Sequence, residues 1–242
     1  MSKKYKSLFF DLDNTLWDFE KNSLEALRQT FLKYNLHARV SNFEGFHQLY
    51  SRINENYWKD YRNKLISKQQ LTSRRFQDTF DSFTLNGIDA AQFNEDYLRI
   101  MPGYNILIDG AVDLLNYLQG KGYKMYIITN GFHEVQHNKL EVSGLIKYFD
   151  RVFISEDIKA PKPNREIFEY ALKSSNSSKK FSLMIGDSWE SDIMGAINFG
   201  MDQVYYSPND KVKLSLGEKT GTSISKPRTI KINKLIQLQG IL

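Results

Sequence analysis

Six short runs of apolar residues occur along the chain, and each is rich in aromatic, β-branched or other large apolar side chains. Runs of this length without polar alternation are typical of strands in a parallel sheet, which are buried on both faces. The predicted strands span residues 7–10, 124–129, 151–154, 182–185, 204–206 and 229–232.

Helical patterns lie between the predicted strands in the second half of the chain. They cover residues 111–119, 165–173 and 191–199. Asn164 is the expected N-cap of the helix at 165–173, because its side chain can accept a hydrogen bond from the first turn. Strands that alternate with helices predict an α/β fold with a doubly wound parallel sheet.

Residues 18–101 show no comparable strand signal, and their apolar spacing is helical. The predicted helices span residues 22–34, 42–63 and 73–84. Residues 41–44 form a capping-box pattern that would open the second of them. The Pro-Gly pair at 102–103 then marks the return to the α/β pattern. We therefore expect an α/β core of residues 1–17 and 102–242 with an inserted all-helical cap of residues 18–101.

Composition and charge narrow the class of protein. The chain has 33 Lys and Arg against 28 Asp and Glu, but this surplus is scattered, so we expect no nucleic acid polymer as a partner. No apolar run is long enough to cross a bilayer and the N-terminus does not resemble a signal peptide, which predicts a cytoplasmic protein without a membrane partner. The lack of cysteine excludes disulfides and a cysteine nucleophile. Nothing in the sequence indicates the oligomeric state.

Polar residues stand where the predicted strands end. Asp11 and Asp13 follow the first strand, Thr129 ends the second, and Asp187 follows the fourth. Lys162 lies in the loop after the third. Each residue alone has an ordinary structural explanation, since aspartates often begin turns. Because the carboxyl ends of parallel strands line the ligand crevice of such a sheet, the set together predicts a functional site.

The three aspartates at this edge favour a metal ion. Asp11, Asp13 and Asp187 would bring three negative charges together, which is costly unless a cation lies among them. Oxygen ligands without cysteine suit Mg²⁺, which shares its coordination with substrate phosphate.

The remaining polar residues favour a phosphate group as the ligand. Thr129 can donate a hydroxyl hydrogen bond, Asn130 and Gly131 can offer backbone N–H groups, and Lys162 adds a positive charge. A carboxylate nucleophile, a metal, hydrogen-bond donors and a lysine are what phosphoryl transfer requires.

Four motifs in order resemble those of the haloacid dehalogenase superfamily, over about residues 5–17 and 102–232. They are DLDNTL at 11–16, TNG at 129–131, KP at 162–163 and GDSWESD at 186–192. The helical insert resembles the family's cap of the first type.

The resemblance implies a role for each matching residue. Asp11 would form an aspartyl-phosphate, and Asp13 would act as acid and then as base. Mg²⁺ would be held by the Asp11 carboxylate, the Asp13 main-chain carbonyl and Asp187, while Asp192 would support the metal-bound waters. The transferred phosphoryl group would be held by Thr129, Asn130, Gly131 and Lys162. Since true dehalogenases lack the acid at the position of Asp13, phosphatase chemistry is favoured.

Two longer stretches, residues 15–23 and 129–140, resemble the pyrimidine 5′-nucleotidase subgroup of the superfamily. This implies a small phosphorylated metabolite as the substrate, namely a pyrimidine nucleoside 5′-monophosphate. A phosphatase or mutase for a small sugar phosphate or other metabolite is the alternative, and a receiver-like phosphorylation switch is the non-catalytic one. The aromatic residues of the insert are expected in its core, so no base-binding residue is predicted.

His133 and His137 match the H-E-x-x-H pattern of zinc proteases. They follow the TNG motif, where the resembling family has an ordinary helix. We therefore expect no zinc site there.

Overall fold

A computed structural model describes residues 4–209 and 227–242. The chain forms two compact units, Met1–Phe19 with Ile106–Leu242, and Glu20–Asn105. None of the described helices is long and apolar enough to cross a membrane.

The first unit, called the core unit below, contains a six-stranded sheet. Its strands are β1 (Ser7–Phe10), β2 (Lys124–Thr129), β3 (Arg151–Ile154), β4 (Ser182–Gly186), β5 (Asp202–Tyr206) and β6 (Thr229–Ile232). They are all parallel, in the order β3-β2-β1-β4-β5-β6. Every residue of β1 and β4 is buried, as apolar runs between two helical layers require. The doubly wound parallel sheet expected from the sequence is therefore confirmed.

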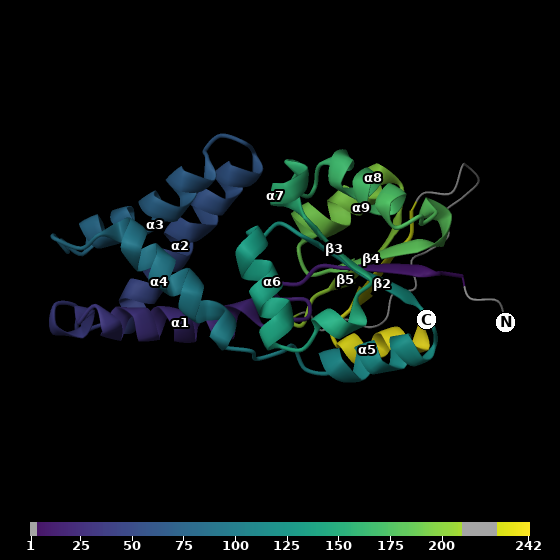
Figure 1. Ribbon diagram of the computed structural model, residues 1–242, viewed down its shortest axis with the longest axis horizontal. Helices are drawn as coiled ribbons and strands as arrows, with labels where there is room; N and C mark the ends of the chain where they lie inside the picture. The colour runs from purple at the N-terminus through teal and green to yellow at the C-terminus, as the bar shows by residue number, and fades with distance from the viewer. Residues whose placement is uncertain (1–3, 210–226) are drawn as a thin grey trace. The chain divides into compact units, whose positions relative to one another are not determined.

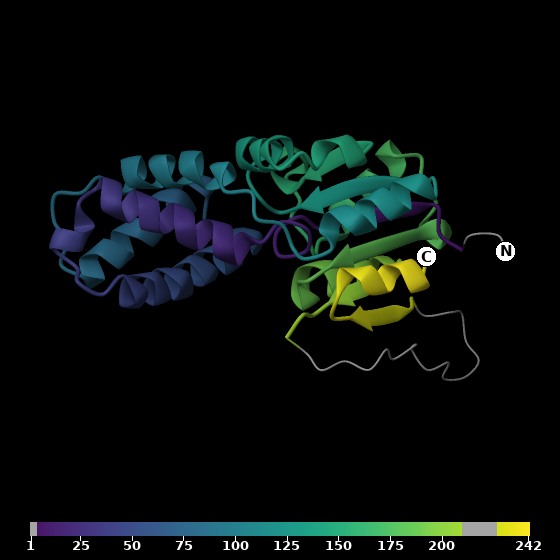
Figure 2. The same ribbon diagram turned by 90° about the horizontal axis from the view of Figure 1, so that it is seen from below.

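Helices cover both faces of this sheet (Figure 1). They are α5 (Ala111–Gly120), α6 (His133–Val142), α7 (Ser155–Ile158), α8 (Arg165–Ser174) and α9 (Met194–Phe199). Apolar residues of α8 and α9 pack with Phe9, Tyr126 and Met184 on one face. On the other face, α5 lies beside the C-terminal turns Leu235–Gly240 (Figure 2). The sheet is thus held rigidly from both sides, which fixes the positions of its strand ends.

Two details of the core helices differ from the sequence analysis. Asn164 precedes α8, but its side chain makes no capping hydrogen bond. The helix expected at 191–199 instead begins with a wider π-type segment, Trp189–Ile193, which continues into α9. That segment starts at Ser188, whose hydroxyl accepts from the Ser191 amide.

The second unit, called the helical unit below, is built from α1 (Phe19–Lys33), α2 (Phe43–Arg62), α3 (Lys68–Ser82) and α4 (Ala90–Ile100). The sequence analysis did not foresee α4. Rings fill the interior, where Phe76 packs between Tyr50, Phe93 and Tyr97. Three aromatic residues of the insert, Tyr50, Phe76 and Phe80, are buried in the core as expected. Others are only partly buried, namely Tyr57, Trp58, Tyr61 and Phe83.

The border between the units lies at 19/20 and 105/106. Backbone hydrogen bonds from Asp18 to Ile106 and from Ile108 to Leu16 join the two crossing segments. The backbone of Trp17 also forms isolated β-bridges with Asp13 and with Leu107. These contacts explain why residues 18 and 19 belong to the core unit.

Asn42, and not Ser41, caps the second helix. The Asn42 side chain accepts from the Gly45 amide at 3.0 Å, while Ser41 is exposed one residue outside the cap. The cap is therefore one residue later than expected, and the capping box expected at 41–44 does not form, because its third helical position is then Gly45.

We predict that Asn42→Ala lowers the free energy of unfolding of the helical unit by about 1 kcal/mol, because one amide of the first turn loses its acceptor. Ser41→Ala is the matched control and should change it little. Urea denaturation followed by circular dichroism measures both, and equal losses would contradict the assignment of the cap.

Candidate active site

The candidate site lies at the carboxyl ends of three neighbouring strands, β2, β1 and β4. Asp11 follows β1, Thr129 is the last residue of β2, and Asp187 follows β4. The register pairs Phe10 with both Ile127 and Ile185, so these strand ends lie at similar heights. Parallel pairing is therefore what brings residues more than 100 positions apart in the sequence to one edge.

Lys162 connects these strand ends through its ammonium group. Its Nζ donates to Asp11 Oδ1 at 2.5 Å, to Asp192 Oδ1 at 2.6 Å and to the Ile128 carbonyl at 2.7 Å. The side chain is only 2% exposed. Burial acts to lower the pKa of Lys162, but the charges of Asp11 and Asp192 outweigh it and raise this pKa above its usual value. The lysine is therefore a permanent positive charge between two carboxylates.

Asp11, Asp187 and Asp192 form an acidic cluster around this edge. One carboxylate oxygen from each lies within 4.8 Å of the others. Burial, together with the neighbouring carboxylates, raises the pKa of Asp11 well above its usual range, although Lys162 opposes the shift. Burial and then the charge of Asp192 raise the pKa of Asp187 to about 7.

This cluster has the properties of a binding site for a hard cation. The cluster sets three carboxylates, of which those of Asp11 and Asp192 are buried and that of Asp187 is half-buried, against the one charge of Lys162, so negative charge is in excess. Its donors are all oxygen atoms, which suit Mg²⁺ better than softer metals. The side chains of Asp11 and Asp187 were predicted from the sequence to bind the metal ion, and Asp192 lies beside them.

Thr15 is part of this cluster, although the sequence analysis did not single it out. Its hydroxyl lies 3.1 Å from Asp187 Oδ1 and accepts from the Asp187 amide, also at 3.1 Å. Asp11 Oδ2 is 3.5 Å away. The sequence feature that could have identified Thr15 is its position four residues after Asp11, inside the first motif. Thr15 thereby links the ends of β1 and β4.

Gly186 leaves room for Asp192, since a Cβ atom there would overlap the Asp192 carboxylate. The second oxygen of Asp192 accepts from the Ser188 amide at 3.0 Å. With Lys162 on the first oxygen, this carboxylate is completely buried and held on both sides. It therefore orients Lys162 and adds to the negative charge of the cluster.

Asp13 lies apart from the acidic cluster and has its own partners. Lys139 Nζ is 2.6 Å from one of its oxygens, and Gln136 Nε2 is 3.0 Å from the other. Both partners belong to α6, and the sequence analysis missed them. The one available signal was a pair of polar residues, three positions apart, on the helical face that also carries Val135 and Leu140.

The predicted phosphate-binding residues make contacts of two kinds. Thr129 Oγ1 accepts from the Gly131 amide at 3.2 Å and from Gln136 Nε2 at 2.5 Å. Asn130 instead pairs with the backbone of Lys162, since its side chain donates to the Lys162 carbonyl at 2.9 Å and accepts from the Lys162 amide at 2.8 Å. The Asn130 side chain thus fixes the loop that carries the lysine.

The two histidines of the H-E-x-x-H pattern lie on the exposed side of α6. His133 Nδ1 is 2.9 Å from Asp157, and the two imidazole rings are 4.7 Å apart. Within the described ranges, the acidic cluster is the one group of three metal-ligating side chains, and it contains neither histidine.

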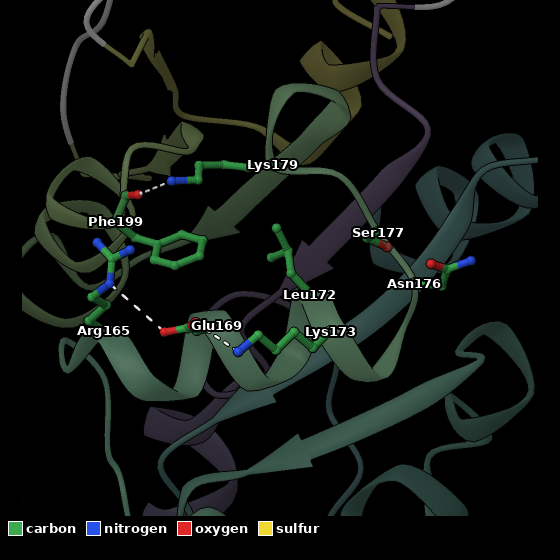
Figure 3. A pocket seen from close by; sticks show the side chains of 8 residues that line it. All are labelled: Arg165, Glu169, Leu172, Lys173, Asn176, Ser177, Lys179 and Phe199. Carbon is green, nitrogen blue, oxygen red and sulfur yellow. Dashed lines mark hydrogen bonds and ion pairs between the residues drawn. The ribbon is translucent and has the colours of Figure 1, made fainter.

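A separate hollow lies on the outer side of α8 (Figure 3). Arg165, Lys173 and Lys179 stand at its rim, and the Lys179 ammonium donates to the Phe199 carbonyl at 2.9 Å. None of the residues predicted for the site lines this hollow. The candidate active site is therefore the edge of the sheet described above.

The sequence model of the haloacid dehalogenase-like hydrolases matches residues 5–200. Pyrimidine 5′-nucleotidase YjjG of Escherichia coli is 37% identical over 82% of this chain and 84% of its own length. Pyrimidine 5′-nucleotidase PynA of Streptococcus pneumoniae is 36% identical over 85% of both. The solved structure of the HAD-hydrolase YfnB of Bacillus subtilis, bound to magnesium, superposes with a TM-score of 0.85 at 30% identity and 99% coverage of both chains.

The raised pKa of Asp187 generates a prediction about stability without metal. In the folded chain Asp187 keeps its proton up to about pH 7, whereas in the unfolded chain it loses the proton near its usual value of 3.8. Stability therefore falls as the pH rises between these values and stays low above pH 7. We expect Asp187→Asn to stabilise the chain in chelator at pH 8, by on the order of 2 kcal/mol, and much less at pH 5.

Thermal unfolding at the two pH values measures this effect. Glu141→Gln, on the exposed side of α6, is the control and should leave the thermal midpoint unchanged at both. Destabilisation by Asp187→Asn at pH 8 would contradict the account of the acidic cluster.

Proposed function

The chain belongs to the family of haloacid dehalogenase-like hydrolases, and from this premise we propose that it is a Mg²⁺-dependent phosphomonoester hydrolase with Asp11 as its nucleophile. The observation that carries the proposal is the surroundings of the Asp11 carboxylate. One oxygen is held by Lys162, and the group lies in a cluster with Asp187 and Asp192 that suits a divalent cation. A second carboxylate, Asp13, stands two residues further on with separate partners.

The first chemical step forms a covalent intermediate. An Asp11 oxygen attacks phosphorus, the ester P–O bond breaks, and Asp13 gives a proton to the departing oxygen. In the second step a water molecule gives a proton to Asp13 and attacks phosphorus, and the bond to Asp11 breaks. Inorganic phosphate leaves, and both aspartates return to their starting state.

Mg²⁺ would be held by the carboxylates of Asp11 and Asp187 and by the Asp13 main-chain carbonyl. When bound, it neutralises negative charge on the phosphoryl oxygens and on the cluster. The donor set fits this ion, because each of the three aspartates of the cluster offers a carboxylate oxygen atom. Asp192 would support the waters of the ion from its buried position.

The transferred phosphoryl group would be held by donors from two loops. Lys162 supplies a charge that its surroundings keep permanent. Thr129 would donate its hydroxyl, and the turn at Asn130 and Gly131 would offer backbone N–H groups. Asn130 also fixes the Lys162 loop, so the two loops hold their positions together.

We infer that the substrates are pyrimidine nucleoside 5′-monophosphates. The support is that two relatives, each covering more than four-fifths of this chain, are pyrimidine 5′-nucleotidases. We also infer that the helical unit is a cap domain, as the resemblance in sequence implied. A phosphatase or mutase acting on a small sugar phosphate is the alternative.

The mechanism predicts metal-dependent turnover that needs Asp11. Phosphate release should be lost in chelator, return on addition of Mg²⁺, and fall by at least about 10³-fold in Asp11→Asn, because the amide is no nucleophile. Asp113→Asn, an exposed position on α5, is the control. Stoichiometric phosphorylation without repeated release would instead indicate a receiver-like switch.

The substrate inference predicts a ranking of kcat/KM. With Mg²⁺ present, uridine and thymidine 5′-monophosphates should be hydrolysed faster than purine nucleotides and faster than sugar phosphates. A panel assayed by phosphate release measures this ranking. Fastest turnover on sugar phosphates would keep the mechanism and overturn the nucleotidase inference.

A further inference from the structure

We propose that Lys139 and Gln136 of α6 are positioning residues that hold the Asp13 carboxylate in place for catalysis. This inference rests on the proposed function, in which Asp13 transfers the protons. Lys139 and Gln136 would act through Asp13 without touching the reacting atoms.

The geometry around Asp13 supports this role. Lys139 Nζ donates to Oδ1 at 2.6 Å, and Gln136 Nε2 donates to Oδ2 at 3.0 Å. Each carboxylate oxygen therefore has its own donor, so rotation of the carboxylate would break both contacts. The two donors are three residues apart on one helix and so project from the same face.

The burial of Lys139 also supports this role. Its side chain is 2% exposed, whereas that of Asp13 is 27% exposed. The ammonium lies 4.4 Å from the centre of the Trp17 ring and 5.3 Å from that of Phe19. In the described part of the chain, Asp13 is the one carboxylate within 4 Å of it.

A buried lysine is a costly way to fill this space. An ammonium loses its hydration on burial, and a methionine would pack against the same rings without that loss. The aromatic rings compensate only in part. The charge is therefore explained by its contact with Asp13 and not by packing.

Gln136 also determines how the Thr129 hydroxyl is hydrogen-bonded. Its amide donates to Asp13 Oδ2 and to Thr129 Oγ1, so both N–H bonds are engaged. Thr129 Oγ1 also accepts from the Gly131 amide. Since this oxygen already accepts two hydrogen bonds, the hydroxyl proton of Thr129 points elsewhere and is available to a phosphate oxygen.

Gly131 shows that this arrangement is built into the local sequence. A Cβ atom at this position would overlap the Gln136 side chain. The turn after β2 therefore needs glycine for Gln136 to reach both Asp13 and Thr129. Gln136 is completely buried, so it can act only by holding other groups.

The test is a double-mutant cycle on turnover of the best substrate in the nucleotide and sugar phosphate panel. We expect Lys139→Met to lower kcat by about 10- to 100-fold, less than the roughly 10²- to 10⁴-fold that proton transfer contributes because Asp13 itself is retained, while KM changes less than about threefold. In the Asp13→Asn background the same substitution should cause little further loss, because the residue through which it acts is already disabled.

Two more variants complete the design. Gln136→Met should lower kcat and also raise KM, because Thr129 loses its fixed orientation, and it tests the proposal even if Lys139→Met fails to fold. Lys147→Met is the matched control, because this exposed lysine also lies over an aromatic ring, that of Tyr148, and the variant should turn over like the wild type.

Two results would overturn the inference. One is a wild-type kcat in both Lys139→Met and Gln136→Met, and the other is an equal loss with and without the Asp13 carboxylate. If the wild-type chain releases no phosphate, the proposed function fails. The contact between Lys139 and Asp13 can then still be tested by measuring the thermal midpoints of the same four variants. Non-additive shifts would then support the pairing of Lys139 with Asp13, and additive shifts would refute it.

Discussion

The buried ammonium of Lys162 is the interaction on which the rest of the site depends. It lies in the loop between α7 and α8 and binds a carboxylate after β1, a carbonyl of β2 and a carboxylate after β4. A lysine at this depth is stable only when paired, and the carboxylates are tolerable only beside it. The ends of three strands are therefore held together by one charge, with Asn130 fixing the backbone of the loop.

Two aspartates close in sequence have different surroundings, which suits two different tasks. Asp11 is buried, paired with Lys162 and close to Asp187 and Asp192, as a nucleophile beside a cation requires. Asp13 is more exposed and is held by two donors from α6. Pairs of carboxyl groups in unlike environments are a recurrent means of dividing acid, base and nucleophilic roles.

Much of the sheet and the position of the site could be predicted from the sequence. Strands of a parallel sheet are buried on both faces, so their apolar runs end where the strands end, and Asp11 and Asp187 follow directly. The partners of these residues were harder to predict. Thr15, Gln136 and Lys139 make their contacts with Asp187 or Asp13, which lie more than 100 positions away in the sequence. These contacts exist only once the separate strands and helices have packed together. Likewise, Ser41 and Asn42 are both residue types that cap helices, and the residue that does so depends on where the backbone becomes helical, which is after Asn42.

The central claim is that Asp11 becomes covalently phosphorylated during turnover. Rapid acid quenching of the Mg²⁺-loaded enzyme with its best substrate, followed by peptide mapping by mass spectrometry, tests this most directly. The account predicts one added phosphoryl group on the peptide that contains Asp11 and none on the corresponding peptide of Asp11→Asn. Steady turnover with no phosphorylated peptide at any quench time, or a phosphoryl group on another residue, would contradict it.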